Sequence, residues 1–317
     1  MIPERQLIEA IRRAATKTVN PAVIFGIGDD CAVLQMPAGL HLLVTTDMCV
    51  EDIHFRREWH PAKSVGHRCL ARGLSDIAAI GGEPLACFLS LALPTNLPQR
   101  WVSEFMAGLL GLAHQFKTPL SGGDTSAAEK ITADIIVLGK VPASEALLRS
   151  KARPGDLIYV TGELGGSAST LRQLYLRGKK AAKAGDRHFY PMPRVAIGRW
   201  LQKNKLATAM IDISDGLSVD LGHLCEESKV DGVVSLKAIP VARGADLSLA
   251  LHGGEDYELL FTAPKLAKLP RRIGGVPITE IGEIRARSDK KTTVKSIDSV
   301  GLLKPLKPAG WEHFTKK

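Results

Sequence analysis

The sequence lacks the signals of a membrane or exported protein. In its 317 residues, no apolar run approaches the roughly 20 residues needed to cross a bilayer. Residues 1–13 have the spacing of an amphipathic helix and lack the apolar core of a signal peptide. We therefore expect a cytoplasmic protein without a membrane partner.

Cysteines and aromatic residues are also scarce. The five cysteines are an odd number and form no CxxC pair, which favours reduced core thiols over disulfides or a zinc site. Aromatic residues make up only 5% of the chain, so we expect an aliphatic core.

The familiar nucleotide-binding and zinc motifs are missing. Residues 162–166 are rich in glycine but lack the lysine of a Walker A loop. The chain has no GxGxxG, no HRD or DFG motif and no HExxH. These absences argue against P-loop enzymes, dinucleotide-binding enzymes, protein kinases and HExxH proteases.

The net charge of +9 does not by itself indicate a nucleic-acid partner. The basic residues are scattered and form no arginine-rich helix or aromatic-interleaved stripe. We therefore expect no nucleic-acid partner and interpret the charge as mostly solvated surface, which helps to attract anionic substrates.

Strand and helix patterns alternate along the chain, which predicts an α/β or α+β class. The turn at 153–156 favours two domains, 1–147 and 148–317. We expect strands at 32–35, 41–46, 85–93, 131–141, 157–160, 207–211 and 257–261, a short strand ending at Leu120, and helices at 61–80, 101–116, 167–177 and from 217.

Aspartates beside small residues are the main chemical signal. Magnesium prefers carboxylate and other oxygen ligands, and aspartates on different loops can converge on it. Without a cation, two such charges about 5 Å apart would repel by roughly 3 kcal/mol at an effective dielectric near 20. The segments concerned are 28–30, 45–47, 75–76, 123–124 and 212–215.

Each segment also has an ordinary interpretation. Asp29-Asp30 fits a turn, Asp47 fits a loop cap, and Ser214 or Asp215 fits the N-cap of the next helix. Asp76 is the strongest functional candidate, because it lies on a mostly apolar helix where a charge should be paired or metal-bound.

The segment 121–125, Ser-Gly-Gly-Asp-Thr, is typical of a phosphate cradle. Its glycines would let backbone amides approach an anion, and its aspartate could hold the accompanying metal.

Taken in order, several segments resemble the thiamine-monophosphate kinase family over almost the whole chain. They are GIGDDCAVL (26–34), TTDMCVEDIHF (45–55), LSDIAAIGGEP (74–84), GGDT (122–125), RSKARPGD (149–156), DISDGL (212–217), GGEDYELLF (253–261) and GWEHF (310–314).

The resemblance implies the fold of the aminoimidazole ribonucleotide and selenophosphate synthetases. In that fold the N-terminal domain pairs in a homodimer and forms a shared β-barrel, and the second domain is α+β. The implied reaction converts ATP and thiamine monophosphate to ADP and thiamine diphosphate, with several magnesium ions.

The resemblance also implies roles for individual residues. The magnesium shell would be Asp30, Thr45, Thr46, Asp47, Asp76, Asp124, Asp212 and Asp215. The ATP contacts would be Gly123, Asp124, Arg149 and Ser214, and catalysis would depend most on Asp47, Asp124 and Arg149. The thiamine-phosphate contacts would be His54, Glu255 and Trp311. A lone histidine and a terminal tryptophan are, on their own, more often structural, although an aromatic face suits a cationic thiazolium ring.

Two positions depart from the family pattern. Asp52 replaces a common glycine before His54, and Arg72-Gly73 replaces a segment that often ends in asparagine. Another ATP-dependent enzyme of the same superfamily, such as an aminoimidazole ribonucleotide synthetase, is an alternative, which His54, Glu255 and the GWEHF tail disfavour. A non-catalytic sensor of nucleotide or thiamine phosphate is a further alternative, which the complete set of candidate ligands disfavours.

Overall fold

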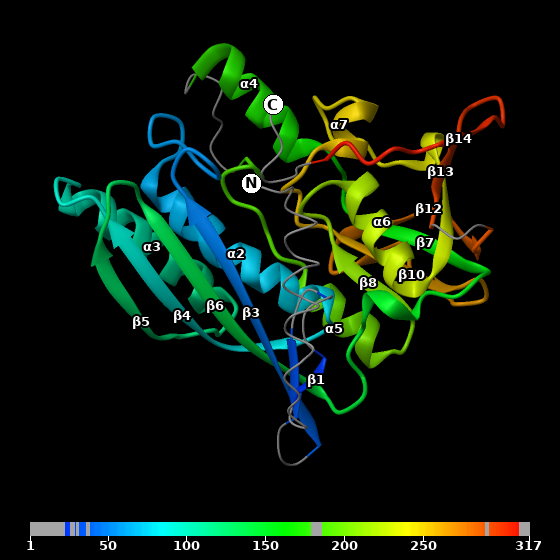
Figure 1. The fold of residues 1–317 in the computed structure, drawn as a ribbon, viewed down its shortest axis with the longest axis horizontal. Coiled ribbons are helices and arrows are strands. Elements are labelled where there is room, and N and C mark those ends of the chain that lie inside the picture. Colours follow the sequence, from blue (N-terminus) through cyan, green and yellow to red (C-terminus); the bar gives the residue numbers. More distant parts are fainter. Residues whose placement is uncertain are drawn as a thin grey trace.

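The computed structural model describes residues 23–25, 29, 32–35, 39–178, 186–288 and 292–310. Two β-sheets lie on either side of helix α2 (Ala62–Ala79) (Figure 1). The mixed class predicted from the alternating patterns is confirmed. The helix expected at 1–13 lies outside the described residues.

The first sheet has six strands in the order β1-β2-β3-β6-β4-β5. All neighbouring strands are antiparallel except β4 and β5, which are parallel. The bounds are β1 (Val23–Phe25), β2 (Ala32–Gln35), β3 (Leu40–Val50), β4 (Glu83–Leu93), β5 (Leu120–Ala127) and β6 (Thr132–Pro142).

Helices α2 and α3 (Gln99–Gln115) pack against each other, and α2 covers one face of this sheet. Alternate residues of β3 and β6, such as Leu43 and Ile135, are buried on that face. Pro61 precedes α2, and Gly81 follows it with φ 74, so the helix begins and ends where these residues predict.

The strand expected to end at Leu120 instead continues through Ser121–Asp124 into β5, so the prediction of a loop there is wrong. Gly123 has φ 150, and a Cβ at this position would lie 1.8 Å from the carbonyl oxygen of Leu89 on β4. The glycine therefore permits close pairing of two strands, which its usual association with loops conceals.

The second sheet has the order β14-β13-β9-β12-β7-β10-β8, and β11 pairs with β12. Only the β13–β9 pair is parallel. The bounds are β7 (Asp156–Thr161), β8 (Ala209–Asp212), β9 (Val230–Ser235), β10 (Leu259–Pro264), β11 (Arg272–Ile273), β12 (Val276–Ala286), β13 (Val294–Ile297) and β14 (Leu303–Pro305).

The central strands of this sheet are buried on both faces. One face packs on α6 (Leu217–Ser228) through Ile158, Ile211 and Leu260. The other face contributes to the core that contains α2 and α5 (Val195–Lys203), through Tyr159 and Phe261. One hydrophobic core therefore continues from the first half into the second.

The remaining helical segments are α4 (Gly166–Arg177), α7 (Leu247–His252) and the short turns η1 (Arg149–Lys151) and η3 (Leu236–Ala238). In the part of the chain that the structure describes, no helix is long and apolar enough to cross a membrane.

Candidate functional site

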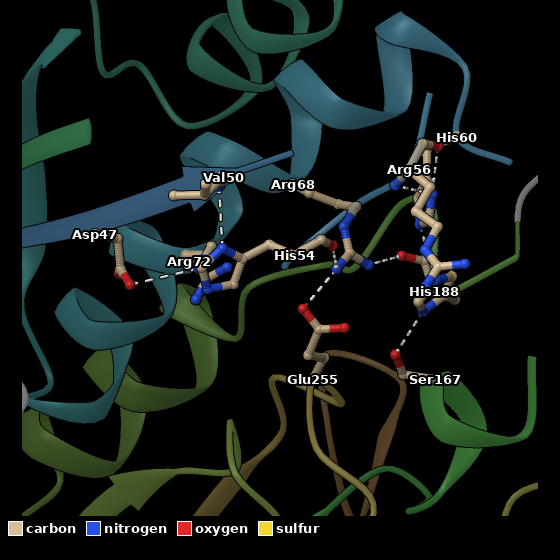
Figure 2. Close-up of polar contacts among 10 residues, drawn as sticks. All are labelled: Asp47, Val50, His54, Arg56, His60, Arg68, Arg72, Ser167, His188 and Glu255. Carbon is tan, nitrogen blue, oxygen red and sulfur yellow. Dashed lines mark hydrogen bonds and ion pairs between the residues drawn. The ribbon is translucent and has the colours of Figure 1, made fainter. Parts of the chain in front are cut away.

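Helix α2 carries three charged side chains on one face. Arg68, Arg72 and Asp76 are spaced four residues apart, so they lie one above another along the helix. Figure 2 shows Arg68 and Arg72 reaching partners on other segments of the chain. This face of α2 is the backbone of the candidate site.

The end of β3 contributes Thr45 and Asp47. Strand alternation turns both side chains toward α2, while Thr46 between them is exposed on the opposite face. The hydroxyl of Thr45 donates a hydrogen bond to Asp76 Oδ2. Arg72 Nε donates to Asp47 Oδ1 at 3.4 Å.

The carboxyl group of Asp47 is under opposing influences. Burial raises its pKa, and the guanidinium of Arg72 and a hydrogen bond with Asp76 act to lower it, with a raised pKa as the net result. Two carboxyl groups in hydrogen-bond contact share a proton or need a nearby cation. A divalent cation would suit this pair, because its preferred ligands are oxygen atoms of this kind.

Asp212 joins this group from the second half of the chain. Ser75, next to Asp76 on α2, donates a hydrogen bond to Asp212 Oδ2 at 2.6 Å, and both residues are buried. Asp212 ends β8, so the contact fixes the second sheet against α2.

Asp215 and Ser214 follow Asp212 in the loop before α6. The N-cap of α6 is Gly216, so the alternative that Ser214 or Asp215 caps this helix is wrong. The carboxylate of Asp220 instead accepts hydrogen bonds from the amides of Asp215 and Gly216, at 3.2 and 3.0 Å.

The loop 253–258 lies directly against the Asp212–Asp215 loop. The amide of Glu255 donates to the carbonyl of Ser214 at 2.7 Å, and the amide of Tyr257 donates to Ile213 at 2.9 Å. Glu255 and Tyr257 have φ of 65 and 51, conformations that non-glycine residues rarely adopt. Such backbone strain is common where a loop presents side chains to a ligand.

Arg68 ties Glu255 to the segment that carries His54. Its Nη2 lies 2.5 Å from Glu255 Oε1 and also donates to the carbonyl of His54. Its Nη1 donates to the carbonyl of His188 (Figure 2). Burial alone would raise the pKa of Glu255, but Arg68 and further positive charges lower it to about 2. The amide of Val50 donates to His54 Nδ1 at 3.0 Å, which orients the imidazole ring.

Both departures from the family pattern have local explanations. Asp52 has φ 66, so the glycine common in the family suits this backbone better, and its carboxylate lies 2.9 Å from Lys130 Nζ. A Cβ at Gly73 would lie 2.6 Å from Val137 Cγ2, so glycine lets α2 approach β6 closely.

Gly123, Asp124 and Arg149 lie apart from this group. Asp124 is exposed on edge strand β5, with β4 and β6 between it and β3, and it pairs in register with Ser90, whose side chain also faces away from α2. Arg149 lies in η1, where its amide donates to Asp29 Oδ2 at 2.8 Å and its Nε lies 3.6 Å from Asp29 Oδ1.

The positions of Asp30 and Trp311 lie outside the described residues. Gly123 lies on β5 beside Asp124. The structure thus brings together Thr45, Asp47, Asp76 and Asp212, with Ser214 and Asp215 in the adjoining loop and His54 and Glu255 around Arg68. Among the described residues, no three His, Cys, Asp or Glu side chains form a group that could hold a metal ion.

Arg68 was not named from the sequence, Ser75 was given no role beside Asp76, and Arg72 was mentioned only as a departure. All three link α2 to segments that are distant in the sequence. The available signal was their place on the face of Asp76, with Arg72 four and Arg68 eight residues before it and Ser75 adjacent to it, because charges on a buried helix need partners.

Comparisons with known proteins identify the family of the chain. The family model for the N-terminal domain of AIR synthase related proteins matches residues 28–141, and the model for their C-terminal domain matches residues 153–295. Thiamine-monophosphate kinase of Haemophilus influenzae is 39% identical over 286 residues, which cover 85% of each chain. Its namesake from Bacillus subtilis is 34% identical and covers 96% of this chain and 98% of its own.

A solved structure gives the same result. AaThiL complexed with AMPPCP and TMP superposes with a TM-score of 0.84 at 31% identity, covering 98% of this chain and 97% of its own. Both the fold and the sequence are therefore shared over nearly the full length.

Proposed function

Because the chain belongs to the thiamine-monophosphate kinase family, we propose that it transfers the γ-phosphoryl group of ATP to thiamine monophosphate. The products are ADP and thiamine diphosphate, and the reaction serves thiamine diphosphate biosynthesis. The observation that carries the proposal is that helix α2 brings two groups into one site: Asp76 of α2 contacts Asp47, with Asp212 bound to the adjacent Ser75, and Arg68 of α2 binds Glu255.

The acceptor needs little activation by the protein. The second pKa of a phosphate monoester is near 6, so its oxygen is already largely deprotonated at pH 7. That oxygen attacks the γ-phosphorus in line, and the bond to the β-phosphate oxygen breaks as ADP leaves. The residues of the site therefore act by alignment and charge compensation, and no general base is required.

Magnesium fits the oxygen donors at this site. Several ions would be held. Ligands near α2 would be Thr45, Asp47, Asp76, Asp212 and Asp215, whereas Thr46 and Asp124, on the opposite face of the first sheet, would need a separate ion, and Asp30 completes the proposed set. Bound there, the ion supplies positive charge that offsets the repulsion between two phosphates. The contact between Asp47 and Asp76 supports this assignment, because a cation would stabilise two adjacent carboxylates.

The remaining residues divide between the two substrates. Gly123, Asp124, Arg149 and Ser214 contact ATP, and His54, Glu255 and Trp311 contact thiamine monophosphate. The site joins an N-terminal domain, 1–147, to a C-terminal domain, 148–317. ATP as co-substrate favours a cytoplasmic location.

The working form is a homodimer that pairs through the first sheet. The face of this sheet away from α2 carries Val44, Phe88, Ile136 and Leu138 half-buried, with Met48 53% exposed. A second copy would cover these apolar side chains and approach Asp124 on the same face. This supports a shared barrel, as the family fold implies.

Product analysis tests the reaction. The protein is mixed with ATP, Mg²⁺ and thiamine monophosphate, and free thiamine serves as the control acceptor. We expect thiamine diphosphate to form in step with ADP, and only from the monophosphate. Binding of both substrates without ADP release would contradict the proposal and indicate a sensor, and failure to bind thiamine monophosphate would indicate another acceptor.

Asp47→Asn tests the site assignment. It keeps the side-chain shape and removes the negative charge, so turnover should fall by roughly 10²–10³-fold, as for other preorganised polar groups. The matched control is Glu104→Gln on α3, where an exposed carboxylate pairs with Arg100. Equal turnover in the Asp47 variant, the Glu104 variant and the wild type would remove Asp47 from the site.

A further inference from the structure

Arg72 has no role in the proposed function, although it lies between the two groups of site residues. It follows Arg68 by one helical turn on α2 and precedes Asp76 by another. In the view of Figure 2, Arg72 lies between Asp47 and the Arg68–Glu255 pair. Tyr257, Asp47 and Glu255 are among the groups that act electrostatically on its guanidinium.

The hydrogen bonds of this guanidinium are incomplete. An arginine side chain has five N–H donors, and Arg72 Nε donates to Asp47 over a long 3.4 Å. Its Nη1 is buried and has no hydrogen-bond partner. Buried donors on a charged group are almost always satisfied, so an unmatched one points to a missing acceptor.

A comparison with Arg68 sharpens this point. Arg68, one turn away, is satisfied by Glu255 and by the carbonyls of His54 and His188. The Arg72 side chain keeps 16% of its surface exposed, against 3% for Arg68. Of the two side chains, Arg72 is therefore the more accessible to a ligand.

We propose that Arg72 binds the phosphate group of the acceptor substrate, which is a phosphate monoester dianion. Arg72 would thereby determine why the protein prefers the phosphorylated acceptor to the free alcohol. This inference rests on the proposed function. A planar guanidinium matches two oxygen atoms of a phosphate at once, which supplies orientation as well as charge.

The position selects the acceptor phosphate over the phosphates of ATP. Arg72 lies one turn from Arg68, which binds Glu255 and the carbonyl of His54, the residues assigned to the thiamine part, and Arg72 Nε donates to Asp47. An acceptor phosphate bound there would have its attacking oxygen beside Asp47. Of the residues assigned to ATP, Gly123 and Asp124 lie on β5 and Arg149 lies in η1 beside Asp29, whereas Ser214 adjoins Glu255 through its carbonyl.

The test measures three affinities by calorimetry, for thiamine monophosphate, free thiamine and ATP with Mg²⁺. In Arg72→Met, affinity for thiamine monophosphate should fall about 30- to 100-fold, as expected for the loss of charge-assisted hydrogen bonds. Affinities for free thiamine and ATP should stay within about twofold. Arg72→Lys keeps the charge and loses the planar fork of the guanidinium. Its affinity for thiamine monophosphate should therefore fall about tenfold, with the other two affinities unchanged.

The control is Arg100→Met, which removes an exposed arginine from α3 and should change none of the three affinities. Equal losses for all three ligands, or loss of folding in both Arg72 variants, would make Arg72 a structural partner of Asp47 and overturn the inference. Unchanged affinity for the monophosphate in Arg72→Met would also overturn it.

The two proposals fail in different ways. A wild-type protein that neither binds nor phosphorylates thiamine monophosphate contradicts the proposed function itself. A wild-type protein that makes thiamine diphosphate, beside an Arg72→Met variant with the same monophosphate affinity and KM, contradicts only the role of Arg72.

Discussion

The central strands of the two sheets differ in how many of their faces this chain covers. In the second sheet, β7, β8 and β10 are buried almost throughout, because α6 lies on one face and the core with α2 and α5 lies on the other. In the first sheet, β3 and β6 alternate between buried and partly exposed residues, because α2 covers only one face.

The two sheets therefore bury their apolar side chains in different ways. The second sheet obtains its burial from its own chain and supplies a rigid edge for Asp212 and Glu255. The first sheet has an apolar face that α2 does not cover, which is why our proposal includes a second copy. The site forms where the covered face of the first sheet meets the edge of the second.

Adjacent isoleucines on β6 test this contrast most strongly. Ile135 is fully buried toward α2, and Ile136 is half-buried on the opposite face. Ile135→Ala should lower the free energy of unfolding by about 2–5 kcal/mol, through lost burial and the cavity left behind. Ile136→Ala should cost about 1 kcal/mol or less in the monomer, because less surface is lost.

Urea unfolding at several protein concentrations distinguishes the two variants. The effect of Ile136→Ala should grow with concentration, because its lost contacts form only in the dimer. The effect of Ile135→Ala should be present at every concentration. Equal, concentration-independent effects would show that one chain covers both faces of the sheet.

Two neighbouring carboxyl groups show how the second half depends on the first. Glu255 is paired with Arg68 of α2, which lowers its pKa to about 2 from an ordinary 4.5 despite burial. Asp256 is supported within its own half by the amides of Gly165 and Ser167, and burial raises its pKa to about 6 from an ordinary 3.8.

The signs of the two pH dependences are therefore opposite. The lowered pKa of Glu255 stabilises the fold above pH 4.5. This contribution of about 3 kcal/mol is lost as the pH falls toward 2. A raised pKa gives stability that is complete below pH 3.8 and is lost, by a similar amount of about 3 kcal/mol, as the pH rises through 6.

Unfolding free energies of Glu255→Gln and Asp256→Asn between pH 3 and 7 check this expectation. The cost of Glu255→Gln should shrink as the pH falls below 4.5. Asp256→Asn should remove the loss of stability between pH 4 and 6. Parallel curves for the wild type and both variants would show that neither carboxyl group is linked to folding as described.

Asp52 offers a smaller test within the first half. Its φ of 66 suits glycine, so Asp52→Gly should stabilise the fold by about 1 kcal/mol. The relief of backbone strain outweighs both the added chain entropy of glycine and the loss of the exposed ion pair with Lys130. Thermal unfolding measures the change, and Lys130→Met controls for the ion pair alone. A lower midpoint in Asp52→Gly than in Lys130→Met would contradict the strain argument.

Local signals predicted much of this fold. Pro61 and Gly81-Gly82 bounded α2 correctly, and the spacing of Trp101, Phe105 and Leu109 located α3. These patterns depend on nearby residues, so the sequence alone contains them. The extension of β5 through Gly122 and Gly123 depends on its parallel partner β4, which no local pattern reveals.

Most of the acidic residues of the candidate site were named from the sequence, but few of its basic residues were. Asp76 was recognised because a charge on an apolar helix is conspicuous, and its contact with Thr45 agrees with that reasoning. Arg68 went unnoticed because its partners, Glu255 and His188, lie more than a hundred residues away. Pairing across such distances is set by the packing of the two halves.

The core that continues from α2 into the second sheet limits how this molecule can move. A rigid-body hinge between the halves would expose Tyr159, Met210 and Phe261 to water, at a large cost in free energy. We therefore expect any opening for substrate exchange to leave this core intact. Probes on either sheet should then report a single cooperative melting transition, with both halves losing structure together.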